Sequence, residues 1–130
     1  MIRIMLRRWP AAVCLGFVLA ALTGPSVTGA KQDPAKPPAE LQVGEAKFKA
    51  NCAGCHGEQG IGTIQGPPLV HKIYEPNHHG DAAFQRAAAT GVRAHHWNFG
   101  NMPKIEGVTP QDVDHITKYV RWLQRQAGIN

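Results

Sequence analysis

The apolar positions of this chain recur at helical rather than strand spacing. A first run of apolar residues among good helix formers begins at Leu41 and ends just before Cys52. No segment alternates between apolar and polar residues as a half-buried strand would, and no internal repeat is present. The pattern therefore predicts an all-α domain from Leu41 onward.

Two later helices are marked by the residues at their ends. Asp81 can cap a short alanine-rich helix over Ala82–Thr90, which Gly91 would close. Thr109 followed by Pro110 is typical of a helix start, and apolar residues then recur at helical spacing. They are Val113, Ile116, Val120 and Leu123, with Tyr119 and Trp122 beside them, in a helix expected to end near Gln126.

Two irregular stretches, residues 57–80 and 92–107, separate these helices. Both lack a sustained apolar period. The first carries several glycines and prolines and is longer than a compact domain normally tolerates without a functional reason. We expect it to wrap a bound group.

The N-terminus is typical of an export signal. Arg3, Arg7 and Arg8 precede an apolar run over residues 11–22, and small residues lead to a cleavage site expected after Ala30. A retained membrane anchor is the alternative, but the apolar run is short for a span, which needs about 20 residues. The chain is thus predicted to comprise a signal over residues 1–30, a Pro-rich linker over 31–40 and one domain over 41–130, exported to a periplasm.

Removal of the signal changes the charge of the protein. The whole chain carries a net charge of +5, from 14 basic and 9 acidic residues. Three basic residues and no acidic ones lie in the predicted signal, which leaves eleven basic against nine acidic, or +2. A charge this small argues against nucleic acid as a partner.

The stretch Cys52-Ala53-Gly54-Cys55-His56 is the strongest chemical signal in the chain. Two thiols two residues apart, followed directly by an imidazole, have the spacing of c-type haem attachment. Each thiol can form a thioether with a haem vinyl group, and His56 can then ligate the iron. A zinc half-site or a redox dithiol is the alternative, but no second ligand pair and no βαβ pattern accompany the motif.

Met102 is the leading candidate for the second iron ligand. It is the only methionine left once the predicted signal is removed, and it lies in an irregular loop that Pro103 stiffens. Ordinary core filling is the alternative role for this side chain.

These residues resemble the small class I monohaem cytochromes c. The likeness covers about residues 41–126 and rests on the Cys52-x-x-Cys55-His56 motif, Gly66-Pro67-Pro68-Leu69 and Met102-Pro103. It implies an all-α cytochrome c fold of three to four helices with long loops around a single covalent haem c. It also implies that the Pro67 carbonyl accepts the Nδ1 proton of His56. A crossing of the first and last helices at Gly44, Phe48 and Tyr119 is implied as well.

The histidines depart from the common pattern of that family. His71, His78, His79, His95, His96 and His115 accompany His56. We interpret the adjacent pairs as solvated loop residues or as hydrogen-bond donors to haem propionates, and a second metal site is the alternative. His95 or His96 could also compete with Met102 for the iron. Trp97 is expected in the pocket, where its indole N–H could bind a propionate.

These features together predict a monomeric, periplasmic one-electron carrier. Its donor and acceptor would be redox proteins that dock weakly at the haem edge, with Lys72 and Lys104 as candidates for steering. Contact with a membrane is expected only through the signal or a redox partner. The alternative is a haem enzyme or sensor whose sixth iron position opens to peroxide or a gas.

Overall fold

The computed structural model describes residues 36–130; the predicted signal and the first half of the predicted linker lie outside this range. The described residues form 3₁₀ turns η1 (Ala39–Leu41) and η2 (Lys72–Tyr74) and helices α1 (Gln42–Asn51), α2 (Ala53–His56), α3 (Asp81–Thr90) and α4 (Pro110–Gln126). No strand occurs within residues 36–130, where Val92 and Met102 form an isolated antiparallel bridge. The predicted all-α class is confirmed.

α1 and α4 cross at the centre of the core. The ring centroids of Phe48 and Tyr119 lie 5.6 Å apart at the crossing, and both side chains are buried. Gly44 lets the two helices approach, because a Cβ at this position would overlap the main-chain carbonyl of His115. The predicted crossing is therefore present, and hydrophobic burial and close packing stabilise it.

The start of α4 is held by side chains as well as by its backbone. Thr109 Oγ1 accepts a hydrogen bond from the Asp112 N–H (3.2 Å), and Asp112 accepts one from the Thr109 N–H (3.1 Å). These reciprocal bonds form a capping box. Lys47 of α1 adds an ion pair with Asp112 at 3.0 Å. The predicted start of the last helix is thus confirmed, and its capping residue Asp112 also links α4 to α1.

One expected helix boundary was wrong. Asp81 does not cap α3: it is the first residue of the helix, Gly80 precedes it, and its carboxylate instead accepts a hydrogen bond from Arg121 Nε at 2.8 Å. The last two residues of the predicted linker, Ala39 and Glu40, belong to η1, which leads into α1.

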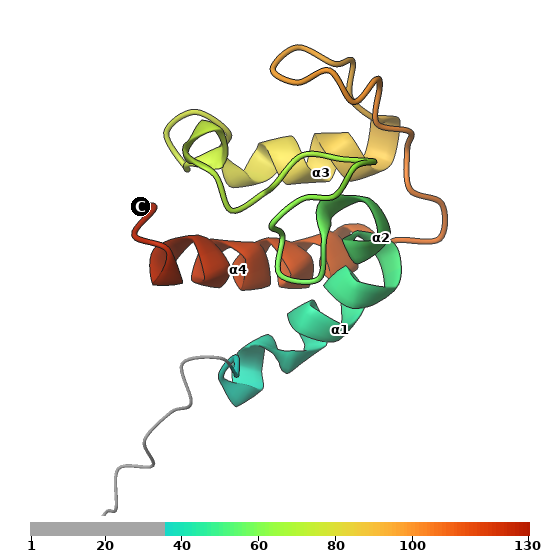
Figure 1. Cartoon of the computed structure of the whole chain (residues 1–130). Coiled ribbons are helices and arrows are strands. Elements are labelled where there is room, and N and C mark those ends of the chain that lie inside the picture. Colours follow the sequence, from blue (N-terminus) through green and yellow to red (C-terminus); the bar gives the residue numbers. More distant parts are fainter. Residues whose placement is uncertain (1–35) are drawn as a thin grey trace, which may run out of the picture. The chain divides into compact units, whose positions relative to one another are not determined.

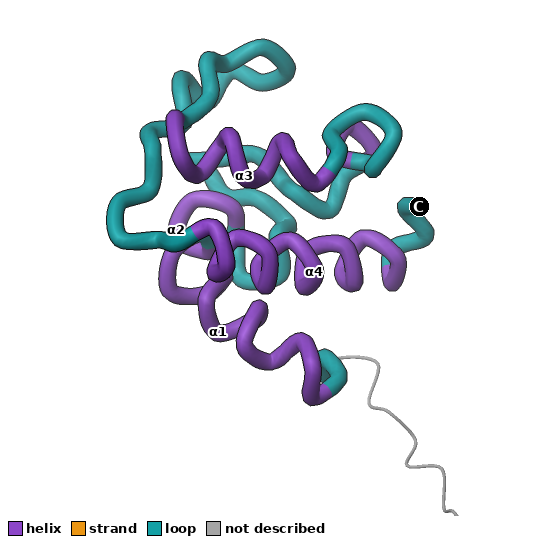
Figure 2. Tube along the Cα trace, turned by 180° about the vertical axis from the view of Figure 1, so that it is seen from behind, coloured by secondary structure: helices purple, strands orange, loops and turns teal. Residues whose placement is uncertain are grey.

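α3 lies alongside α4, and the long loops lie around them. Figure 1 shows residues 57–71 running between these two helices and the loop after α3 extending beyond it before the chain returns to α4. The same arrangement is visible from behind in Figure 2. Within residues 36–130 no helix combines the length and the apolar character needed to cross a membrane.

Candidate haem pocket

A cavity of about 570 Å³ lies among α2, α3, α4 and the two long loops. This volume is in the range of pockets that hold small molecules and cofactors, about 300–1,000 Å³. Its lining includes all six residues that the sequence singled out as cofactor-binding: Cys52, Cys55, His56, Pro67, Trp97 and Met102. Residues spread over half of the domain therefore meet at one site.

The two cysteines are placed by the junction of α1 and α2. Cys52 is the C-cap residue of α1 and directly precedes the single turn of α2, and the Cys55 N–H donates to the Cys52 carbonyl at 3.2 Å. Both thiols are free, with Cys55 exposed and Cys52 partly buried. Burial, with a smaller contribution from Cys55, raises the pKa of Cys52 to about 11. A thiol with such a high pKa is mostly protonated at neutral pH, so it is a poor ligand for zinc and a poor nucleophile in disulfide exchange.

His56 is buried and its ring is fixed by one hydrogen bond. Its Nδ1 lies 2.8 Å from the Pro67 carbonyl oxygen. Since a carbonyl only accepts, Nδ1 carries the proton and Nε2 keeps a free lone pair. Burial lowers the pKa of His56, and the bond to Pro67 opposes this shift in part. The imidazole is thus neutral and oriented as a metal-ligating histidine should be.

Met102 lies in the loop between α3 and α4, and its main chain is tied down. Its N–H and carbonyl exchange 2.9 Å hydrogen bonds with Val92, and the Ile105 N–H donates to the Ala88 carbonyl at 2.9 Å. Gly91, whose φ is 76°, lies against the main chain of Met102. A Cβ at this position would be only 2.5 Å from the Met102 carbonyl oxygen, so a side chain would not fit. These contacts hold Met102 at the cavity.

Trp97 contributes a buried polar group that lacks a partner. Its indole Nε1 is buried and makes no hydrogen bond within the described residues. Burial raises the pKa of the Tyr74 phenol, and the Trp97 indole N–H, which is close to this oxygen but outside hydrogen-bond geometry, offsets part of that rise. Because buried N–H groups are nearly always satisfied, an unpaired one beside a cavity points to an acceptor on a bound group.

Apolar residues of α3, of α4 and of the loop before α4 form much of the remaining wall of the cavity. The sequence alone did not point to them as site residues. Ala83, Phe84 and Ala87 of α3 line the cavity together with Val108 and Ile116. The spacing of Ala83 and Ala87 places them on one face of a helix, which was the only local signal. An apolar cavity with two thiols, a free imidazole nitrogen, a thioether and an unpaired N–H fits a haem.

Of the other histidines and the two proposed steering lysines, some lie at the cavity and others on the surface. His95 and His96 line the same cavity, whereas His71 packs edge-on against Trp97. Lys104 pairs with Glu106 at 2.7 Å on the surface, and Lys72 is exposed in η2. His79 also lines the cavity, so the two long loops together bring three extra imidazoles to the pocket. One of the two steering candidates, Lys104, already has an acidic neighbour.

Comparison with known proteins agrees with this geometry. Residues 41–124 match the family Cytochrome c. A Cbb3-type cytochrome c oxidase subunit CcoP of Rubrivivax gelatinosus is 34% identical over 88 residues, which is 66% of this chain and 27% of that protein. The chain thus aligns with about a quarter of the length of this relative. No solved structure matches this chain. Because the family match covers most of the described residues and includes the haem motif, the chain belongs to the cytochrome c family.

Proposed function

We propose that this protein is an exported monohaem c-type cytochrome that carries one electron at a time between redox proteins in a periplasm. Membership of the cytochrome c family supports a covalently bound haem c and a role in electron transfer. The observation that carries the finer proposal is the single cavity onto which Cys52, Cys55, His56 and Met102 converge. The haem would supply reversible one-electron chemistry at its iron.

Each residue of the cavity has a defined task in this proposal. Cys52, at the junction of α1 and α2, and Cys55 of α2 would anchor the group covalently. His56 would bind the iron through its free Nε2, while the Pro67 carbonyl holds the ring orientation and increases the basicity of the imidazole. Met102 would supply the second ligand, and its soft thioether would favour the reduced state and raise the reduction potential. None of these tasks requires an acid or a base.

The relative suggests where to look for a partner. It is named as a subunit of a cytochrome c oxidase, so an oxidase complex is the first electron acceptor to test. The exposed haem edge would dock weakly and release quickly, as redox encounters use small interfaces. Lys72 is the better of the two steering candidates, because Lys104 pairs with Glu106.

Optical spectroscopy of the haem-loaded protein tests the ligand assignment. We expect a low-spin, six-coordinate ferric spectrum with the weak far-red sulfur-to-iron band. Met102→Ala should abolish this band and leave high-spin iron, while His95→Ala and His96→Ala should keep it. An unchanged band in Met102→Ala would disprove the assignment. High-spin iron in the unaltered protein would favour the sensor or enzyme with an open sixth position.

A further inference from the structure

Three histidines outside the proposed haem ligands form a cluster on the surface. His78 and His79 lie between η2 and α3, and His96 lies in the loop between α3 and α4. One ring nitrogen from each lies within 4.8 Å of those of the other two. His78 and His96 are exposed and His79 is half-buried, so solvent reaches the cluster directly. Two loops that are distant in sequence therefore place three imidazoles at one point.

The ring of His79 already has the orientation of a metal ligand. Its Nδ1 lies 2.7 Å from the carbonyl oxygen of Ile73 and donates its proton there, so in the neutral ring the free lone pair is on Nε2. Histidines that bind metals typically donate their second ring N–H to a carboxylate or a main-chain carbonyl in this way. The carbonyl of Ile73 thus orients the ring of His79 through Nδ1, in the same way as the carbonyl of Pro67 orients the ring of His56.

The spacing of the other two rings also suits one ion. His78 Nε2 and His96 Nε2 are 3.2 Å apart. Two nitrogens bound to one tetrahedral ion at about 2.0–2.1 Å stand about 3.3 Å from each other. Without an ion, one of the two must carry a proton that bridges them. A metal ion can therefore replace this proton with little movement of either ring.

The main chain beneath the cluster is held in place. The N–H groups of His78 and His79 both donate to the Glu75 carbonyl, at 3.0 and 2.8 Å. The buried guanidinium of Arg121 donates to the main-chain carbonyls of His79 and Tyr74. Such anchoring lowers the entropy lost when ligands are ordered around an ion.

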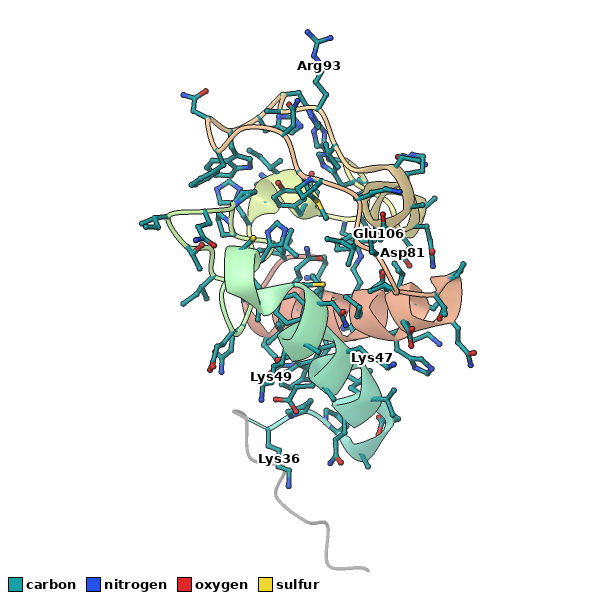
Figure 3. The ribbon with its side chains drawn as sticks, turned by 90° about the vertical axis from the view of Figure 1, so that its right-hand side faces the viewer. Lys36, Lys47, Lys49, Asp81, Arg93 and Glu106 are labelled. Carbon is teal, nitrogen blue, oxygen red and sulfur yellow. The ribbon has the colours of Figure 1, made fainter. Side chains whose placement is uncertain are left out.

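The charges around the cluster do not exclude a cation. The charge of Arg121 is directed to Asp81, with Nε and Oδ1 2.8 Å apart. Arg93 lies in the same loop as His96, but its side chain points away from the body of the protein (Figure 3). His95 is adjacent, yet its ring nitrogens do not belong to the trio, which leaves the fourth position to water. An all-imidazole set selects Zn(II) or Cu(II) over Mg(II) or Ca(II).

We propose that His78, His79 and His96 bind a divalent transition-metal ion of the Zn(II) or Cu(II) class at the rim of the haem pocket. The site is separate from the proposed iron ligands His56 and Met102. It does not depend on which redox partner the protein serves. Two of its ligands, His79 and His96, also line the large cavity, so the ion would lie next to the bound cofactor.

Metal titration of the haem-loaded, chelator-treated protein tests this site. We expect a single Cu(II) or Zn(II) ion per chain with a Kd below about 1 µM at neutral pH. Cu(II) should give an electron paramagnetic resonance signal with hyperfine structure from several nitrogens. Addition of Zn(II) should leave the absorption spectrum of the haem unchanged, because the iron ligands are not used.

Variants distinguish this site from adventitious binding. His78→Ala and His96→Ala should each weaken binding more than about a hundredfold, beyond the loss typical of a supporting residue. His115→Ala on α4 is the matched control and should bind like the unaltered protein. If alanine perturbs the loop, His78→Gln is the second variant to test, because it keeps a polar side chain without the imidazole. The absorption spectrum of the haem shows whether each variant is folded. Affinity weaker than about 1 µM, or equal affinity in all variants, would overturn the proposal.

Discussion

Gly44 in α1 lies against the main-chain carbonyl of His115 in α4, too close for any side chain to fit between them. Gly44→Ala should therefore force the helices apart at the Phe48–Tyr119 contact. We expect a loss of about 1–3 kcal/mol in the free energy of unfolding, measured by denaturant titration of the haem-loaded protein. The better helix propensity of alanine is too small to offset this overlap.

Gly80→Ala is the control for this substitution. A Cβ at Gly80 would meet only the Pro76 carbonyl oxygen, at an ordinary 3.6 Å. Alanine is a poorer residue before a helix, but it also restricts the unfolded chain, and the two effects nearly cancel. Equal losses in the two variants would show that the close approach of α1 and α4 is not the cause.

Arg121 is expected to stabilise the fold strongly although it is charged. It is 7% exposed and donates to Asp81, Gln124 and the carbonyls of Tyr74 and His79. Arg121→Met keeps the length of the side chain but removes the donor to the His79 carbonyl and to the buried Gln124 Oε1, which should cost about 2–4 kcal/mol. Thermal or denaturant unfolding would measure this loss. Arg125→Met, on the exposed face of α4, should cost less than about 1 kcal/mol.

Asp112 should make the stability of the protein depend on pH in the acidic range. The hydrogen bond with Lys47, followed by those with Thr109, lowers its pKa from 3.8 to about 2. A carboxyl group whose pKa falls on folding stabilises the folded state above its unfolded pKa, and the contribution disappears as the pH drops through the folded pKa. Asp112→Asn should therefore be less stable than the unaltered protein at neutral pH. The difference should narrow between about pH 4 and 2, and a constant difference would contradict this assignment.

Trp97 should affect the acid–base behaviour of the bound haem. If its unpaired Nε1 donates to a propionate, the bond stabilises the carboxylate form, and Trp97→Phe should raise the pKa of that propionate. The inflection of the midpoint potential with pH should then move upward by about 0.5–1 pH unit. Trp122→Phe on α4, whose ring stacks on Tyr119, should leave the inflection in place.

Local signals in the sequence predicted most of the helices and the attachment motif. Thr109 and Pro110 mark a helix start by their own chemistry, and Cys52, Cys55 and His56 are adjacent in the chain. A helix boundary that depends on a distant partner was predicted less well. Asp81 was expected to cap α3, but it pairs with Arg121, forty residues away. No local pattern distinguishes such an arginine from a solvated one.

The arrangement of the loops also could not be predicted from the sequence. The two histidine pairs were visible, but the 3.2 Å approach of His78 to His96 depends on how loops on either side of α3 fold. The same holds for Ala83 and Phe84 in the cavity wall, which look like ordinary helix residues. Packing between distant segments decides these positions, whereas propensity and capping act within a few residues.

The paired hydrogen bonds between Val92 and Met102 close a loop at its base. The residues between them can change in length or composition without displacing Met102, because the closure lies at the ends of the loop. His96 and Trp97 both lie within it. The stretch is therefore a region in which relatives of this protein can gain or lose binding groups beside the pocket while the proposed iron ligand keeps its place.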